Sequence, residues 1–368
     1  MINLFDTASE AHEIKDELLK ELESVISSGW YLLGQRLTNF EMAFGRYVGS
    51  KYSCGVHSGT DALTLSLKAL GIGPGDEVIT TPLTAVYTVY ALAETGAKPI
   101  LSDIDPATLN LDPKLISSKI TKKTKAIIPV HLHGFPADMP AFEEFGTKKI
   151  AIVEDVAQAL GATIEGKMVG TYGKIGCYSF YPTKNLGAMG DGGMIVTDDE
   201  SVSLEVKLLR QGGLTDRDNY LHERVSIHSR LDEIQSAILS VKLKHLSSWL
   251  AKRREVANYY SQKMASFPIT LPPSTSGFES SYHLYCIRTR EREELQAYLR
   301  EKEIGSQVHY KTPVHLQPCF KNLGYRQGDF PEAEKAAREL LSLPMHPYLE
   351  KYDQDEVIKT IGEYFEKA

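Results

Sequence analysis

Two patterns of hydrophobic positions alternate along the chain. Steps of three and four residues, typical of the buried face of a helix, predict helices at residues 14–26, 60–70, 85–95, 112–120, 139–145 and 201–211. Short apolar runs between them predict strands at residues 77–81, 99–102, 126–130 and 150–154. Because the strands are apolar and alternate with helices, we expect an α/β fold with a mainly parallel sheet covered on both faces.

The pattern changes after a polar loop at residues 212–229. A long helix is predicted from residue 231 through 249 to 260, and a turn-rich stretch follows at 268–281. The remaining pattern predicts a small α+β unit, with strands at 282–289 and 305–309 and helices at 291–302 and 331–341. A chain of 368 residues has room for two or three domains. We place a large domain at residues 1–246 and a small C-terminal domain at residues 247–368.

Composition excludes several classes of protein. The chain has 41 Lys and Arg residues against 48 Asp and Glu residues, a net charge of -7, and no dense basic run, which disfavours nucleic-acid binding. Its 4 cysteines form no CxxC pair, so we expect reduced thiols, no metal site and a cytoplasmic location. The N-terminus lacks a signal-peptide pattern, and no apolar stretch is long enough for a membrane helix.

Lys184 stands in a glycine-rich loop between two predicted strands. One strand ends near Phe180, the loop runs through Pro182 and Gly187, and the next strand starts near Met194. A loop held at both ends in this way projects its lysine toward a cavity. A single lysine in a loop is usually a solvated surface charge, so a functional role for Lys184 depends on which other segments lie near it.

Two further segments are expected near this lysine. A buried strand ends at Asp155, and α/β folds bind ligands at the carboxyl ends of parallel strands. Ser58, Gly59 and Thr60 open a predicted helix, whose free N–H groups and dipole suit a phosphate. Taken alone, Asp155 could cap the next helix and Ser58 could be an ordinary N-cap. Together with the loop lysine, they are the parts of a pyridoxal 5'-phosphate site.

The motifs in these segments resemble one family closely. EDVAQ at residues 154–158, SFYPTKNLG at 179–187 and GDGGMI at 190–195 are similar to the DegT/DnrJ/EryC1/StrS family of pyridoxal-phosphate-dependent sugar aminotransferases. GIGPGDEV at 71–78, SRLDEIQ at 229–235 and short motifs at 309–315 also match, in family order. The resemblance implies a fold-type I, aspartate-aminotransferase-like architecture, working as a homodimer with shared active sites.

The resemblance also assigns roles to individual residues. Lys184 would form the Schiff base with the cofactor and shuttle the proton, and Asp155 would pair with the ring nitrogen. Gln158 would lie beside the ring and its hydroxyl group. The residues that would bind the cofactor phosphate are Gly59, Thr60 and Ser179.

Two positions depart from the family pattern. Ala85 stands where many relatives place an aromatic ring that stacks on the cofactor, so either a small aliphatic contact suffices or Tyr87 takes that place. Tyr87 could equally be a core residue. His228 stands where relatives commonly have an asparagine that reaches the cofactor phosphate of the partner subunit. A histidine could donate the same hydrogen bond, or it could be an ordinary loop residue.

Aromatic and basic side chains near these motifs are candidates for substrate binding, because they can stack on a base or sugar and offset diphosphate charge. The main candidates are Tyr181, Arg230, His309, Tyr310 and His315. Further candidates are Lys311, Trp30 and Tyr31. For Trp30 and Tyr31, packing in the core or at an interface is an equal alternative.

The resemblance implies an enzyme that moves the amino group of L-glutamate, through pyridoxamine 5'-phosphate, to a keto group of a nucleotide-linked sugar. A dTDP-linked 3-keto- or 4-keto-6-deoxy sugar is the expected acceptor. The alternatives are a keto-inositol acceptor and a catalytically silent regulatory homologue. The joint presence of Lys184, Asp155 and Gln158 argues against the silent homologue.

Overall fold

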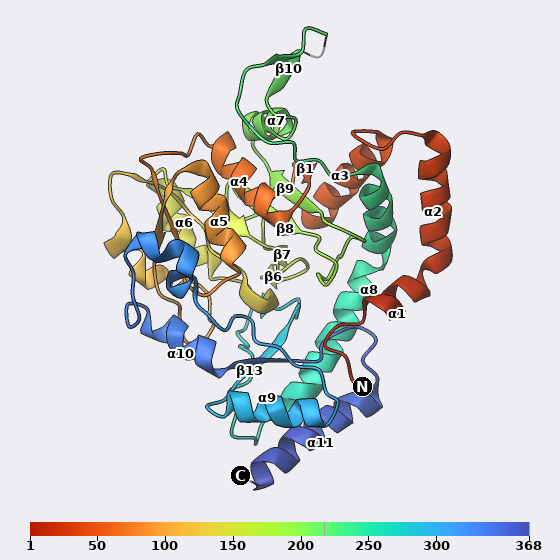
Figure 1. Cartoon of the computed structure of the whole chain (residues 1–368), viewed down its shortest axis with the longest axis vertical. Helices are drawn as coiled ribbons and strands as arrows, with labels where there is room; N and C mark the ends of the chain where they lie inside the picture. The colour runs from red at the N-terminus through yellow and green to blue at the C-terminus, as the bar shows by residue number, and fades with distance from the viewer. Residues whose placement is uncertain (217, 368) are drawn as a thin grey trace.

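A seven-stranded sheet forms the centre of the protein (Figure 1). The computed structural model describes residues 1–216 and 218–367. In spatial order the strands are β1 (Tyr52–Val56), β9 (Gly193–Thr197), β8 (Ile175–Ser179), β5 (Ala151–Asp155), β4 (Thr124–Ile127), β2 (Glu77–Thr80) and β3 (Lys98–Leu101). β9 is antiparallel to both of its neighbours, and the other pairs are parallel. The mainly parallel sheet expected from the sequence is confirmed.

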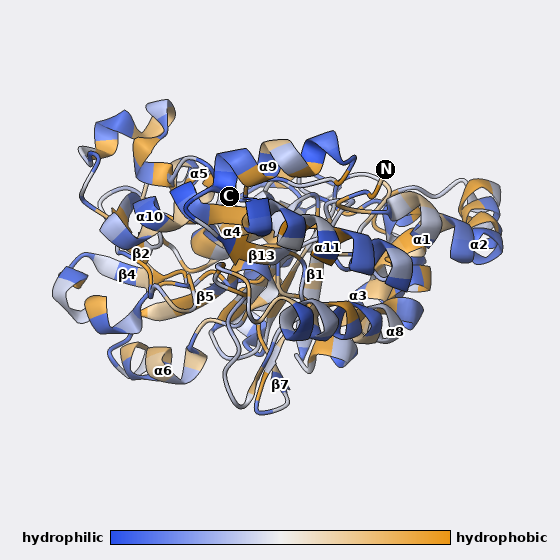
Figure 2. Ribbon diagram, turned by 90° about the horizontal axis from the view of Figure 1, so that it is seen from below, coloured by the Kyte–Doolittle hydropathy of each residue, from blue (hydrophilic) through white to orange (hydrophobic). Residues whose placement is uncertain are grey.

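Alternate residues of the strands face two hydrophobic layers. Ile152 and Tyr178 face the first layer, whereas Val153 and Cys177 face the second. The first layer contains α3 (Gln35–Val48), α6 (Met139–Thr147) and the N-terminal half of α8 (Glu233–Lys263). The second contains α4 (Gly59–Ala69), α5 (Val86–Thr95) and α7 (Glu200–Leu209). Since helices cover both faces, the strands are largely apolar, and Figure 2 shows hydrophobic residues concentrated around them.

A smaller unit packs at one end of the sheet and shares α8 with it (Figure 1). Its two strands, β13 (Tyr285–Arg288) and β14 (Leu340–Leu343), are antiparallel. Its helices are α9 (Arg292–Glu301), α10 (Pro331–Glu339) and α11 (Lys351–Lys367). The continuous α8 passes through residue 246, and Val256 and Tyr260 of its C-terminal half pack in the small unit. The domain boundary at residue 246 stays a prediction.

Shorter elements complete the described chain. N-terminal helices α1 (Thr7–Glu13) and α2 (Lys15–Ser28) pack near α8. Strands β10 (Leu214–Asp216) and β11 (Leu221–His222) form a hairpin that projects from the body beside α7 (Figure 1). The remaining elements are β6 (Thr163–Ile164), β7 (Lys167–Met168), β12 (Phe278–Glu279), η3 (Leu132–Gly134), η4 (Val314–Leu316) and η5 (Pro318–Leu323). Of the helices described, none combines the length and apolar character that a membrane crossing requires.

Several predicted elements differ from the structure. Residues 112–120 form two short turns, η1 (Pro113–Leu115) and η2 (Ser117–Lys119), because the Ser118 hydroxyl bonds the Leu115 carbonyl in place of a continued helix. Residues 305–309 contain one bridge, between Gln307 and Ser342, and no strand. The predicted loop at 212–229 contains the β10–β11 hairpin. Helices α3 and α11 and strand β1 were not predicted.

Candidate active site

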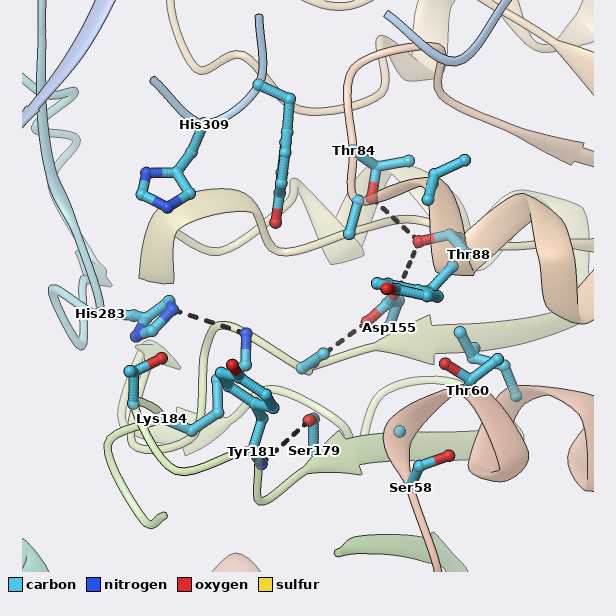
Figure 3. Close-up of a pocket in the computed structure, with 18 of the residues that line it drawn as sticks. Ser58, Thr60, Thr84, Thr88, Asp155, Ser179, Tyr181, Lys184, His283 and His309 are labelled. Atoms are coloured by element: carbon cyan, nitrogen blue, oxygen red, sulfur yellow. Dashed lines mark hydrogen bonds between the residues drawn. The ribbon is translucent and has the colours of Figure 1, made fainter. Parts of the chain in front are cut away.

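A cavity of about 1000 Å³ opens at the carboxyl ends of β5 and β8 (Figure 3). It lies between the start of α4, the loop that carries Lys184 and residues 307–312 of the small unit. The predicted site residues that line it are Gly59, Thr60, Ala85, Asp155, Ser179, Tyr181, Lys184, His309 and Tyr310. The fold therefore brings the strand-end acid, the loop lysine and the helix start to one place, as the sequence motifs predict.

Lys184 lies in the loop that connects β8 to β9. Its backbone N–H donates to the Tyr181 carbonyl at 2.8 Å, and Asn185 Nδ2 donates to the Ser281 carbonyl at 3.0 Å, so the loop is held on both sides of the lysine. Burial lowers the pKa of Lys184 to about 8, although the negative charge of Asp155 favours the charged amine. Part of the amine population is therefore uncharged near neutral pH, as a general base requires.

Asp155 is the buried last residue of β5. The Ala157 N–H donates to its Oδ1 at 3.1 Å, and the Thr88 hydroxyl donates to its Oδ2 at 2.8 Å. Thr88 in turn accepts from Thr84 at 2.9 Å, because its own proton is used on Asp155. Burial raises the pKa of Asp155, and these bonds and the charge of Lys184 oppose that rise. The carboxylate keeps oxygen lone pairs available for a further N–H donor.

The first turn of α4 closes another side of the cavity. The Ser58 hydroxyl accepts from the Asp61 N–H at 3.1 Å, and the first N–H groups of the helix, at Gly59 and Thr60, have no acceptor within the helix. A Cβ atom on Gly59 would lie 2.7 Å from Ser179 Cβ. Glycine at this position therefore lets the helix start approach the Ser179 hydroxyl closely. N–H groups, a hydroxyl and the helix dipole together suit a phosphate.

Gln158 is buried next to the cavity and connects it to the small unit. Its Oε1 accepts from the His133 backbone N–H at 2.8 Å, and its Nε2 donates to the Tyr310 hydroxyl at 2.9 Å. His133 Nε2 bonds to the His309 carbonyl at 2.8 Å, and because a carbonyl only accepts, the ring proton is on Nε2. Gln158 is outside the lining residues, and it holds His309 and Tyr310 at the cavity wall.

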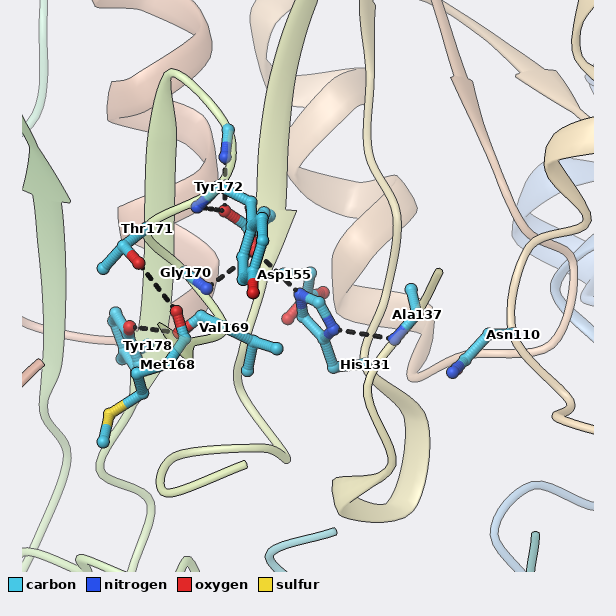
Figure 4. Close-up of polar contacts among 12 residues, drawn as sticks. Asn110, His131, Ala137, Asp155, Met168, Val169, Gly170, Thr171, Tyr172 and Tyr178 are labelled. Carbon is cyan, nitrogen blue, oxygen red and sulfur yellow. Dashed lines mark hydrogen bonds and ion pairs between the residues drawn. The ribbon is translucent and has the colours of Figure 1, made fainter. Parts of the chain in front are cut away.

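A buried network anchors the strand that carries Asp155 (Figure 4). Glu154, fully buried, accepts from the N–H groups of Gly170, Tyr172 and Gly173 at 2.6–2.8 Å. It also bonds to His131 Nε2 at 3.1 Å, while His131 Nδ1 accepts from the Ala137 N–H. His131 is therefore neutral with its proton on Nε2. The carboxylate connects β5 to the segment at 170–173 and fixes the end of the strand.

Ala85 and Tyr87, the two candidates for contact with the cofactor ring, both line the cavity. Ala85 precedes α5, and Tyr87 lies in its first turn. Tyr87 is 59% exposed, so it is not a core residue. Its ring contacts Tyr90 edge-on, with centroids 5.8 Å apart. Contact between the cofactor ring and either Ala85 or Tyr87 stays a prediction.

Besides Gln158, three predicted site residues lie outside the lining of the cavity in their own chain. His315 is buried, bonds to Glu334 at 3.1 Å and packs its ring on Phe330, which favours a packing role over substrate contact. His228, on the exposed segment after β11, and Arg230 are not among the lining residues. The contact of His228 with a partner subunit stays a prediction.

The further substrate candidates divide in the same way. Lys311 lines the cavity. Trp30 and Tyr31 are 62% and 49% exposed, which excludes the core alternative and leaves an interface or substrate contact. Among the residues that the structure describes, no group of His, Cys, Asp or Glu side chains is arranged to hold a metal ion.

Three residues of the site were missed from the sequence. Thr88 bonds Asp155, His133 bonds the His309 carbonyl, and His283 approaches the Lys184 amine. Thr88 follows Thr84 by one helical turn, a spacing that could have indicated a shared polar face. For His133 and His283 the chain offers no periodic signal, because their partners come from distant segments.

Comparisons with known proteins agree with this geometry. Residues 12–362 match the model of the DegT/DnrJ/EryC1/StrS aminotransferase family. A pleiotropic regulatory protein of Geobacillus stearothermophilus is 42% identical over 99% of this chain and 98% of its own. The dTDP-3-amino-3,4,6-trideoxy-alpha-D-glucose transaminase of Streptomyces venezuelae is 40% identical over 100% and 97%. The crystal structure of S. venezuelae DesV with a ketimine intermediate superimposes with a TM-score of 0.97, at 40% identity over 100% of this chain and 99% of DesV. The chain thus belongs to the DegT/DnrJ/EryC1/StrS aminotransferase family.

Proposed function

We propose that the cavity binds pyridoxal 5'-phosphate and that the protein transfers the amino group of L-glutamate to a keto group of a nucleotide-linked sugar. The observation that carries this proposal is the convergence of Lys184, Asp155 and the Gly59 helix start on one cavity. The residues fit the cofactor: an amine of lowered pKa, a carboxylate with free lone pairs, and a cradle that a Cβ on Gly59 would fill. When bound, the cofactor supplies a ring that withdraws electrons from the reacting carbon.

Lys184 is the proton carrier in this proposal. Its Nζ would take a proton from the α-carbon of the amino donor in the first half of the reaction and would deliver a proton to the sugar carbon in the second half. The lowered pKa, about 8, lets the same amine accept and release the proton near neutral pH. The hydrogen bonds on both sides of the loop limit the positions that the lysine can reach.

Asp155 would hold a proton on the ring nitrogen of the bound cofactor. The bonds from Thr88 and the Ala157 N–H fix the carboxylate, so its remaining lone pairs are oriented before any ligand enters. A cationic ring nitrogen beside Asp155 would favour the charged carboxylate and oppose the effect of burial on its pKa. The start of α4 and the Ser179 hydroxyl would bind the phosphate.

The acceptor is proposed to be a 3-keto sugar linked to dTDP. The S. venezuelae relative, similar along nearly its entire length, is named for a dTDP-3-amino sugar. In this chain Tyr181, His309, Tyr310 and Lys311 line the cavity and can stack on the sugar or base and bind diphosphate. A 4-keto sugar and a keto-inositol are the acceptors against which the proposal is tested.

A homodimer is proposed for the working enzyme. The β10–β11 hairpin projects from the body, and its neighbourhood exposes apolar side chains: Tyr220, Leu221, Val225 and Ile227. An exposed apolar segment is typical of an interface. A second subunit would also explain why His228 and Arg230 lie outside the cavity of their own chain.

A cytoplasmic location is proposed because none of the cysteines Cys54, Cys177, Cys286 and Cys319 forms a disulfide.

Reconstitution with the cofactor tests the proposal. The protein is mixed with pyridoxal 5'-phosphate, and visible absorbance is expected that borohydride abolishes and that Lys184→Ala does not show. Amino transfer from L-glutamate is then measured with dTDP-linked 3-keto and 4-keto sugars and with a keto-inositol. Near wild-type transfer by Lys184→Ala would overturn the mechanism. Absorbance without transfer to any acceptor would favour the silent regulatory alternative, which the name of the G. stearothermophilus relative raises.

A further inference from the structure

His283 lies beside the Lys184 amine, and nothing in the roles described above uses it. Its Nε2 is 3.5 Å from Lys184 Nζ, and Figure 3 shows the amine between His283 and Asp155. A charged lysine amine can only donate, so Nε2 is the acceptor and the imidazole proton is on Nδ1. Nδ1 is buried and has no hydrogen-bond partner among the residues that the structure describes. The ring orientation therefore comes from packing and not from a second hydrogen bond.

Packing holds this ring from two directions. The Phe5 ring stacks on His283, with centroids 6.2 Å apart and planes inclined by 20°. On the backbone side, Gly134 has a φ of +101°, and a Cβ there would lie 2.8 Å from the backbone nitrogen of His283. Only glycine allows this close approach. The position of His283 is thus set by an N-terminal residue and by a glycine of the large domain.

The segment around His283 is also joined directly to the lysine loop. Asn185, the residue after Lys184, donates to the Ser281 carbonyl at 3.0 Å. Arg253 of α8 donates to the Tyr282 carbonyl at 3.3 Å. These contacts connect the segment that carries His283 to the lysine loop and to α8.

The electrostatic surroundings keep His283 neutral. Burial lowers the pKa of His283 well below its usual value, and the charges of Lys184 and Arg253 act in the same direction. His309 and His133 also face it, and burial lowers the pKa of His309 to about 4 and that of His133 to about 3. A neutral imidazole can accept from Lys184 throughout the pH range in which the amine titrates.

We infer that His283 is a positioning residue: it accepts a hydrogen bond from the Lys184 amine whenever that amine is not bonded to the cofactor. The inference rests on the proposed role of Lys184, whose amine is free during both halves of the reaction. A free lysine side chain has several rotatable bonds, and one fixed acceptor restricts them. His283 therefore determines where the free amine waits between proton transfers.

The cofactor-free protein provides the direct test. Trace labelling with acetic anhydride over a pH series, followed by mass spectrometry, measures the pKa of each lysine. In His283→Leu, loss of the acceptor removes a bond to the charged amine, so the pKa of Lys184 should fall by about one pH unit. His283→Gln, which places an amide oxygen near the same point, should restore it. If the leucine variant does not fold, His283→Met makes the same change.

His346→Leu is the matched control, because His346 is also a buried histidine with an unpartnered Nδ1 among the described residues, and it is outside the lining of the cavity. It should leave the Lys184 pKa unchanged. A Lys184 pKa in the His283→Leu variant at or above the wild-type value, or a folded glutamine variant that does not restore it, would overturn the inference. In the loaded enzyme, His283→Leu should lower kcat about tenfold with the KM for glutamate within twofold. Since the labelling needs no cofactor, a protein that fails to bind pyridoxal 5'-phosphate would refute the proposed function without affecting this result.

Discussion

Replacing Lys184 by methionine is expected to stabilise the cofactor-free protein. Methionine keeps an unbranched side chain of similar length and removes the amine. Burial lowers the pKa of Lys184 from its usual 10.5 to about 8, which at about 1.36 kcal/mol per pH unit corresponds to roughly 3 kcal/mol. At pH 7 the wild-type protein must hold a charged amine in a site that disfavours it. The variant should therefore unfold with a free energy up to about 3 kcal/mol higher than the wild type.

The stability difference between Lys184→Met and wild type depends on pH, because the pKa of Lys184 is lower in the folded protein than in the unfolded chain. Between about pH 8 and 10.5 the unfolded chain binds a proton at Lys184 that the folded protein has lost, so the stability of the wild type rises with pH in that window. Below pH 8 both states bind the proton, and the wild type keeps its full disadvantage. The stability difference between Lys184→Met and wild type should thus be largest at pH 7 and shrink steadily toward pH 10.

Urea unfolding of the two apoproteins at pH 7, 8.5 and 10 measures this difference. Other groups that titrate at high pH affect both proteins equally, so the difference isolates Lys184. Lys335→Met, at an exposed position on α10, is the control and should change stability by less than about 0.5 kcal/mol at every pH. A Lys184→Met protein that is less stable than wild type at pH 7, or a difference that does not shrink with pH, would refute the reasoning.

Three further outcomes follow from the contacts of the site. Gly59→Val should weaken binding of pyridoxal 5'-phosphate at least tenfold, because any Cβ there would lie 2.7 Å from Ser179 Cβ. A titration followed by absorbance measures the affinity, and an unchanged affinity would contradict phosphate binding between Gly59 and Ser179. Glu154→Gln should lower the free energy of unfolding by about 3 kcal/mol, because an amide cannot accept all of the bonds made by the buried carboxylate. Thr88→Val should lower kcat about tenfold with little change in KM, because it removes the hydrogen bond to Asp155 Oδ2. A tenfold rise in KM with unchanged kcat would contradict this prediction.

The fold class and the convergence of three segments on one cavity could be predicted because their signals are local. A strand that ends in Asp155, a lysine between two strands and a helix opened by Gly59 each occupy a few consecutive residues, and parallel strands bring such ends together. Helix α3 shows the opposite case. Its N-cap, Gly34, has no capping side chain, and Glu233, 199 positions away, accepts from the Gly34 N–H instead. A cap supplied from another helix leaves no signal in the local sequence.

The same reason explains why part of the site was missed. His283 is placed by Phe5 and Gly134, which are separated from it by more than a hundred positions in the chain, and nothing near His283 reveals either contact. The motif makes His315 a candidate for substrate binding, yet its partner, Glu334, is buried with it. A motif indicates that a residue matters, and only packing decides whether its side chain reaches the cavity.

The distribution of charge in the cavity explains how an acidic protein could bind two anionic ligands. The chain has a net charge of -7, so its overall field does not attract phosphates. Burial lowers the pKa of His309 to about 4 and that of His283 well below its usual value, so these two lining histidines add hydrogen-bonding capacity without positive charge. Anion binding then depends on the N–H groups at the start of α4 and on Lys311 at the cavity lining. Because the histidines stay neutral, Lys184 is not held near a cluster of positive charges, and its proton remains free to move during the reaction.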